Sequence, residues 1–164
     1  MDFIMFLKQD LAIAAFFLVG MQGVGGGGTV TAVTSAQKVV LGLETRLALV
    51  RSTDTDVVVK VTMINHGPGT ILVLRWNLPR DGQLTNSLFE ITRDGKPVEY
   101  HGRMVKRQVT TSDYIRMKPG KYSATISLAQ AYDVKPPGHY TVRYSVFNQM
   151  TVPIDSNELV IERK

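Results

Sequence analysis

The feature of this sequence that most constrains its fold is an apolar residue at every second position, repeated in segment after segment. In residues 140–146 (YTVRYSV), tyrosine and valine alternate with threonine, arginine and serine. A period of two places alternate side chains on opposite faces of a β-strand, one toward a core and one toward water. No segment after residue 40 sustains the 3.6-residue period of a long helix, and only residues 128–134 suit a single helical turn. The chain is therefore predicted to be all-β.

Turn residues separate the strand segments at short intervals. Asp94-Gly95 is a strong hairpin signal, and Lys118-Pro119-Gly120 has the Pro-Gly order of a type II turn. Short strands with one wet face favour an antiparallel immunoglobulin-like β-sandwich of about 7–9 strands, with Tyr140 and Tyr144 in its core and Trp76 as its buried tryptophan. Besides residues 140–146, the predicted strands are residues 43–49, 57–64, 71–74, 88–92, 98–100, 122–128 and 159–161.

Residues 1–36 differ from the rest of the chain. Residues 11–19 (LAIAAFFLV) are wholly apolar but shorter than the roughly 20 residues of a membrane-spanning helix. Small residues follow, and they suit cleavage after Ser35 or Ala36. Residues 1–36 are therefore predicted to be a signal peptide or, alternatively, an uncleaved anchor with a glycine-rich tether. Both alternatives make residues 37–164 one exported β-sandwich domain, periplasmic or secreted.

The exported part is basic. Lys8, Asp2 and Asp10 are the only charged residues before Gln37, so 18 Lys and Arg face 12 Asp and Glu in the remainder. This balance favours acidic partners such as an anionic polymer. Nucleic acid is not expected, because export removes the usual target and no recognition motif is present. A membrane is expected as a partner only if the N-terminal segment stays uncleaved.

Motifs for catalysis or metal binding are missing from the sequence. His66, His101 and His139 share no local metal spacing and no H-E-x-x-H pattern, and the chain has no cysteine. There is no G-x-S-x-G elbow and no phosphate loop. Asp54 and Asp56 form a D-x-D pair, which offers calcium too few ligands and is typical of a solvated turn. We therefore expect no catalytic residue, no metal, no cofactor and no enzymatic activity.

Two stretches resemble a known family. Residues 89–107 (FEITRDGKPVEYHGRMVKR) and 112–144 (SDYIRMKPGKYSATISLAQAYDVKPPGHYTVRY) resemble the N-terminal β-sandwich of secreted deuterolysin-type zinc metalloendopeptidases, the peptidyl-Lys group. The similarity covers about residues 57–146 and implies a sandwich fold and export. Within it, residues 133–140 resemble a tyrosine corner. In that family the zinc motif lies in a separate C-terminal helical domain, and no position here matches it. The resemblance therefore implies a free-standing accessory domain without the catalytic domain.

These observations predict an exported, non-catalytic module that binds another protein, with a protease or an envelope component as the expected partner. A basic cluster is the candidate binding surface, and an ordinary solvated face is the alternative interpretation. The cluster consists of Arg103, Lys106, Arg107, Arg116, Lys118 and Lys121.

Two other functions fit the sequence. A glycan- or cell-wall-binding module would use exposed aromatic side chains, for which Trp76, Tyr100, Tyr114 and Tyr132 are the candidates. A protease inhibitor would use a projecting loop, for which residues 77–86 (NLPRDGQLTN) are the candidate.

Overall fold

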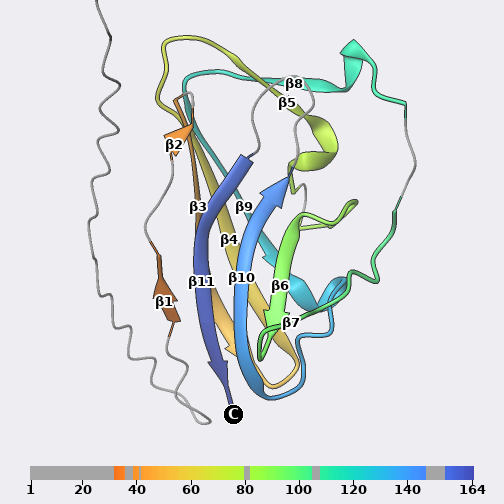
Figure 1. Cartoon of the computed structure of the whole chain (residues 1–164). Helices are drawn as coiled ribbons and strands as arrows, with labels where there is room; N and C mark the ends of the chain where they lie inside the picture. Colours follow the sequence, from red (N-terminus) through yellow and green to blue (C-terminus); the bar gives the residue numbers. More distant parts are fainter. Residues whose placement is uncertain (1–31, 36–38, 41, 80–81, 105–107, 147–153) are drawn as a thin grey trace, which may run out of the picture.

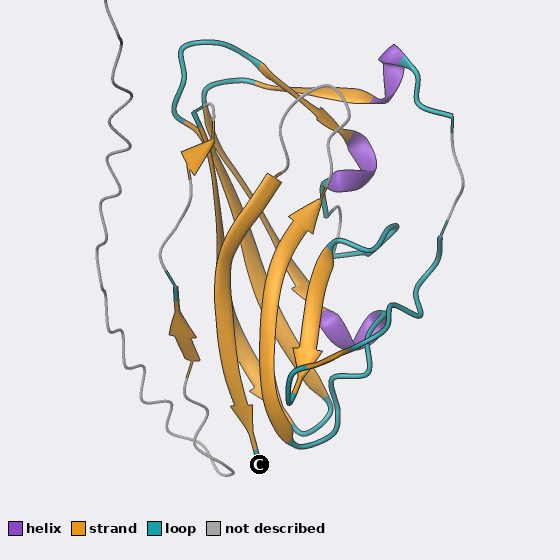
Figure 2. Cartoon of the chain, viewed as in Figure 1, coloured by secondary structure: helices purple, strands orange, loops and turns teal. Residues whose placement is uncertain are grey.

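The computed structural model describes residues 32–35, 39–40, 42–79, 82–104, 108–146 and 154–164. Within these ranges the chain is all-β, as predicted, with antiparallel strands and three single-turn 3₁₀-helices but no α-helix (Figure 1, Figure 2). None of the helices in this part of the chain is long and apolar enough to cross a membrane. The strands are β1 (Ala32–Thr34), β2 (Val39–Val40), β3 (Leu43–Thr53), β4 (Asp56–Asn65), β5 (Ile71–Leu74), β6 (Phe89–Arg93), β7 (Lys96–Pro97), β8 (Tyr114–Met117), β9 (Gly120–Ser127), β10 (Gly138–Val146) and β11 (Ile154–Arg163).

Two sheets form the sandwich. One has the strand order β1-β11-β10-β6-β7, and the other has the order β2-β3-β4-β9. Figure 1 shows β3, β4 and β9 lying behind β11, β10 and β6. Strands β5 and β8 form a separate two-stranded arm at one end. The predicted antiparallel β-sandwich is confirmed, with additional short strands at its edges and in the arm.

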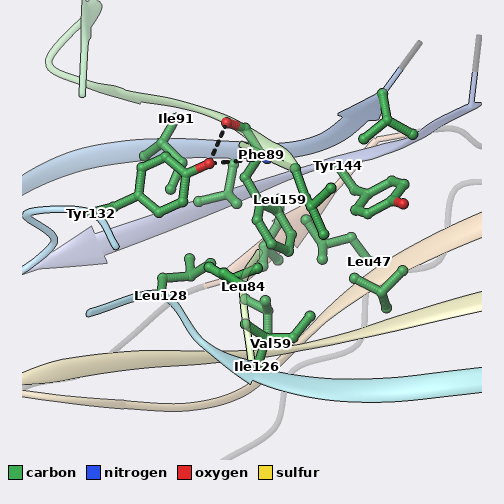
Figure 3. Close-up of a cluster of buried hydrophobic side chains, with 14 of the residues drawn as sticks. Leu47, Val59, Leu84, Phe89, Ile91, Ile126, Leu128, Tyr132, Tyr144 and Leu159 are labelled. Carbon is green, nitrogen blue, oxygen red and sulfur yellow. Dashed lines mark hydrogen bonds between the residues drawn. The ribbon is translucent and has the colours of Figure 1, made fainter. Parts of the chain in front are cut away.

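The core follows the alternation in the sequence. Tyr140, Val142 and Tyr144 of β10 are at most 1% exposed, so the prediction of core tyrosines is confirmed. Leu47, Val59 and Ile126 of the other sheet are buried in the same cluster, as Figure 3 shows. Burying apolar surface of this kind contributes roughly 25 cal/mol per Å².

Trp76 does not have its predicted position. It lies on the 3₁₀-helix η1 (Arg75–Asn77) at the end of β5, where its side chain is partly exposed. The prediction of a buried sandwich tryptophan was wrong, because the chain leaves the strand at Leu74 and turns into η1 instead of continuing into the core.

The Asp94-Gly95 hairpin is confirmed. It joins β6 and β7, with φ angles of 52° at Asp94 and 76° at Gly95. Positive φ at both central residues defines the type I′ turn that matches the twist of the flanking strands. The return strand ends at Pro97, so the strand predicted over residues 98–100 is wrong. Tyr100 instead makes an isolated β-bridge to Tyr132.

The tyrosine corner implied by the family resemblance is present. The Tyr140 hydroxyl donates a hydrogen bond of 2.7 Å to the carbonyl oxygen of Pro136, four residues earlier. This bond fixes the connection that leads into β10. Because the ring itself is buried, the hydroxyl has little access to water as a substitute partner.

A Tyr140→Phe variant should be less stable by about 1 kcal/mol, since it keeps the ring and loses one intramolecular hydrogen bond. Urea unfolding followed by circular dichroism measures this difference. Tyr114→Phe, at a partly exposed tyrosine, is the control and should change stability by less than about 0.5 kcal/mol. Equal effects of the two variants would show that the corner bond adds no stability.

The side chain of Asn157 joins the two sheets. Its Oδ1 accepts a hydrogen bond of 2.8 Å from the Leu47 N–H, and its Nδ2 donates one of 2.9 Å to the Leu47 carbonyl oxygen. Asn157 is 2% exposed and belongs to β11, whereas Leu47 belongs to β3. The amide thus takes the place of a neighbouring strand and satisfies both backbone groups of Leu47.

Strand β1 lies within the predicted N-terminal segment, residues 1–36, yet it pairs with β11. Ala32, Val33 and Thr34 lie opposite Ile161, Val160 and Leu159 in antiparallel register. Val33 is 53% exposed, so its side chain adds little apolar burial. Ordering a residue's backbone costs about 1–2 kcal/mol, whereas a net hydrogen bond contributes about 0.5–1.5 kcal/mol. Strand β1 is therefore weakly held.

Candidate functional site

Three of the predicted basic residues lie at one end of the sandwich. Arg116 is on β8, Lys118 is in the connection between β8 and β9, and Lys121 is near the start of β9. All three side chains are exposed. We call these three residues the basic turn. The two-residue connection carries the chain from the β5–β8 arm into β9, the edge strand of the four-stranded sheet. The three cations, which are close in the sequence, therefore lie at the edge of the fold.

Arg103, another member of the predicted cluster, does not join them. Arg103 is exposed in the loop after β7, and its carbonyl oxygen accepts a hydrogen bond of 3.0 Å from the Tyr100 hydroxyl. Tyr100 is bridged to Tyr132, just after the 3₁₀-helix η3 (Leu128–Gln130), which follows the end of β9 that lies away from the basic turn. Lys106 and Arg107 lie outside the described residues.

Apolar side chains accompany the basic turn on the β5–β8 arm. Leu72 lies opposite Arg116, and Val73 lies opposite Ile115. Val73 is buried, whereas Leu72 and Ile115 remain partly exposed. Cations beside partly exposed apolar groups are suited to an acidic protein surface with some apolar area, because protein interfaces combine both kinds of contact.

The four aromatic candidates for sugar stacking lie in two places. Tyr132 is only 4% exposed, and Tyr100 packs edge-to-face against it with ring centroids 5.3 Å apart. Trp76 and Tyr114 lie near the β5–β8 arm, where Leu74 pairs with Tyr114. The burial of Tyr132 raises the pKa of its hydroxyl and shows that it serves the core. The four residues therefore do not form one stacking platform.

The loop proposed for protease inhibition is packed down along much of its length. Asn77, Leu78, Pro79 and Leu84 are buried, and Leu78 and Leu84 belong to the core cluster. The carbonyl oxygen of Gly82 accepts a hydrogen bond of 2.6 Å from the Gln130 side chain. Residues 80–81 lie outside the described residues. The described part of this loop does not project, because its apolar residues are drawn into the core.

The three histidines occupy separate places. His66 Nε2 lies 2.7 Å from an oxygen of Glu44, and His139 Nδ1 lies 2.7 Å from an oxygen of Glu162. The hydrogen bond from Arg46 lowers the pKa of Glu44, although burial opposes this effect. His101 is exposed in the loop after β7. Across the described residues, no group of three or more His, Cys, Asp or Glu side chains has an arrangement that could hold a metal ion.

Asp56 of the D-x-D pair has an internal role. Its Oδ1 accepts hydrogen bonds of 2.8 Å from the Ser127 hydroxyl and 3.2 Å from the Ala129 N–H, where η3 begins. Asp54 is exposed in the turn between β3 and β4. Asp54 therefore lies in a solvated turn, as expected. Asp56 does not, because it stabilises the connection between β9 and η3.

A shallow depression of about 330 Å³ lies beside the β6–β7 hairpin. Arg93 and Lys96 contribute positive charge to its lining, and Asp94, Glu99 and Asp133 contribute negative charge. This mixture favours neither an anion nor a cation. Since the lining contains no paired nucleophile and base, the depression has no assembled catalytic group.

Fold and surface together define an all-β sandwich whose candidate site is an exposed basic surface and not a pocket. No protein-family model matches the chain. An extracellular protease from Aeromonas hydrophila is 38% identical to it over 106 residues, which make up 63% of this chain and 30% of that protease. The chain therefore spans less than a third of the relative's length. The match supports the predicted relation to a secreted protease and the prediction of secretion.

Proposed function

We propose that this chain is an exported, non-catalytic β-sandwich module that binds another protein, and that a secreted protease is its partner. The observation that carries the proposal is the 38% identity to part of an extracellular protease. We propose further that the sandwich corresponds to the N-terminal sandwich of deuterolysin-type proteases and not to their catalytic domain, and that its location is periplasmic or secreted.

Several features of the structure support binding over catalysis. The sandwich strands enclose a continuous apolar core, so the module has a stable frame of its own. The described residues bring together no metal-binding cluster, and the basic turn stands exposed beside partly exposed apolar side chains. Such a surface gives a partner both electrostatic attraction and apolar contact.

Titration of the purified chain into the Aeromonas hydrophila extracellular protease, followed by calorimetry, tests the proposal directly. We expect saturable binding at physiological salt and a change in the protease's rate on a protein substrate. Heparin serves as a polyanion control, because a basic module binds it through charge alone. Absence of binding to the protease, or binding only to heparin and only at low salt, would contradict the proposal.

Reversing the charge of the basic turn should weaken protease binding. The triple variant R116E/K118E/K121E replaces three exposed cations by anions, and we expect a 10- to 100-fold higher Kd, about 1.4–2.8 kcal/mol. The loss should shrink as salt is added, because exposed charges are screened.

The matched control is R51E/K60E/K135E, which reverses three exposed cations elsewhere on the sandwich. This variant changes the net charge by the same amount, and it should alter Kd by less than threefold, about 0.7 kcal/mol. An equal loss in both triple variants would mean that net charge, and not the basic turn, attracts the partner. No loss in either would place the binding surface elsewhere.

A further inference from the structure

Within the described residues, the outer edge of β11 is covered over part of its length. On one side β11 pairs with β10 from Ile154 to Arg163. On the other side, the described part of β1 pairs with residues 159–161, and Ser35 adds two hydrogen bonds to Glu158 of 3.1 and 2.8 Å. Nearer its start, β11 is closed off by the contact of Asn157 with β3. The edge from Glu158 to Arg163 is thus the part of β11 that a further strand can reach.

The strand that covers this edge is easily displaced. Val33, Thr34 and Ser35 are all exposed, so β1 is held mainly by its backbone hydrogen bonds. A longer extended segment can pair with all six residues from Glu158 to Arg163 and so form more of these bonds. Cleavage after Ser35, as the sequence predicts, would also release β1. Sheet edges with unpaired backbone groups are ready templates for strand pairing.

We propose that this edge is a strand-addition site, at which an extended segment of the partner protein replaces β1. The identification of the partner as a protein rests on the proposed function, whereas the site itself rests on the pairing and exposure of β1 and β11. Strand addition of this kind draws affinity from backbone hydrogen bonds and selectivity from alternate side chains.

The outer face of β11 defines the chemistry of the added segment. Glu158 and Glu162 are exposed on this face, and the partly exposed Val160 lies between them, opposite Val33 of β1. Directly opposed side chains of antiparallel strands interact, and opposite charges attract. On the β10 side, His139 contacts Glu162 and Arg143 lies opposite Glu158, but Arg143 donates its side-chain hydrogen bond to Glu90. The site is therefore suited to a segment with a basic, an apolar and a basic residue at alternate positions.

A disulfide clamp on β1 tests the proposal in the full chain. Val33 and Val160 are directly paired, and the chain has no other cysteine, so V33C/V160C gives a single cross-link. The probe is a fluorescent peptide, Thr-Lys-Thr-Val-Thr-Lys-Thr, followed by anisotropy. We expect at least tenfold weaker binding to the oxidised variant than to the reduced one, with full recovery after dithiothreitol. A peptide with proline in place of valine should not bind to either form.

Equal binding of the peptide to the oxidised and reduced variants, or no binding to the reduced one, would overturn the strand-addition site. Unchanged thermal unfolding of the oxidised protein verifies that the clamp leaves the fold intact. If the chain forms a dimer and the clamp abolishes that dimer, the proposal would also be overturned, because a second copy of the chain would then be the occupant.

The same variants separate this inference from the proposed function. If the protease binds the oxidised and reduced variants equally, the chain is a protease-binding module but the edge of β11 is not the contact. If the protease binds neither variant while the clamp controls the peptide, the edge is a strand-addition site but the proposed function fails.

Discussion

Replacing Asn157 with alanine is expected to lower the free energy of unfolding by about 2–4 kcal/mol. The variant removes the amide that accepts a hydrogen bond from the Leu47 N–H and donates one to the Leu47 carbonyl oxygen. Each buried polar group left without a partner costs about 1–3 kcal/mol, and Leu47 is only 2% exposed. Urea unfolding, followed by tryptophan fluorescence and by circular dichroism, measures the loss.

Gln83→Ala is the control for this prediction, because Gln83 is exposed and the change removes an amide from the surface. It should change stability by no more than about 0.5 kcal/mol. A similarly small effect of Asn157→Ala would mean that water satisfies Leu47 and that the amide does not hold β3 and β11 together. An unchanged urea m-value would show that the substitution alters stability and not the denatured state.

Features set by neighbouring residues could be predicted from the sequence. The alternation in residues 140–146 predicted a buried face of β10, because the strand period is intrinsic to the backbone. The Asp94-Gly95 pair predicted its hairpin, since these residues tolerate positive φ. The tyrosine corner spans only four residues between Pro136 and Tyr140, so it too has a local signature. In each case the interacting groups are close in the sequence.

Features that depend on distant residues could not be predicted. Asn157 and Leu47 are 110 positions apart, and an asparagine in a strand gives no sign of its partner. The sequence around residues 78 and 84 predicted a projecting loop, but both side chains are buried in the core of the sandwich. The prediction that the basic residues form one cluster failed for the same reason. Charge along the sequence does not reveal that Arg103 lies beside Tyr100, which bridges to Tyr132, whereas Arg116 lies on β8.

The two proposed contact regions lie on different elements, which makes them separable by mutation. The basic turn is at the end where β8 leads into β9, and the strand-addition site is at the edge where β1 covers β11 (Figure 1). The basic turn contributes no side chain to the buried core cluster. The strand-addition site contributes its inward-facing Leu159 and Ile161, whereas its outward-facing side chains lie outside the cluster. Variants at Arg116 or Val33 should therefore change binding while the fold is retained.

Phe89→Ala should produce the largest loss of stability, about 3–5 kcal/mol, because it removes a buried aromatic ring and leaves a cavity. Phe89 is 4% exposed and packs edge-to-face against Tyr144 and Tyr132, with ring centroids 5.6 and 6.4 Å apart (Figure 3). A domain of this size has a total stability of about 5–15 kcal/mol. The variant should thus be close to unfolding at 37 °C, and its melting temperature, measured by calorimetry, should fall steeply.

The ring and the backbone of Phe89 make separate contributions that a second variant distinguishes. The Tyr132 hydroxyl accepts a hydrogen bond of 3.1 Å from the Phe89 N–H and donates one of 3.0 Å to its carbonyl oxygen. Tyr132→Phe removes these bonds and keeps both rings, so we expect a smaller loss of about 1–3 kcal/mol. Phe89→Leu, which refills most of the cavity, should recover part of the loss seen with alanine. If alanine and leucine at position 89 were equally destabilising, cavity volume would not explain the effect. The edge-to-face contacts with Tyr132 and Tyr144 would then be the dominant contribution of this ring.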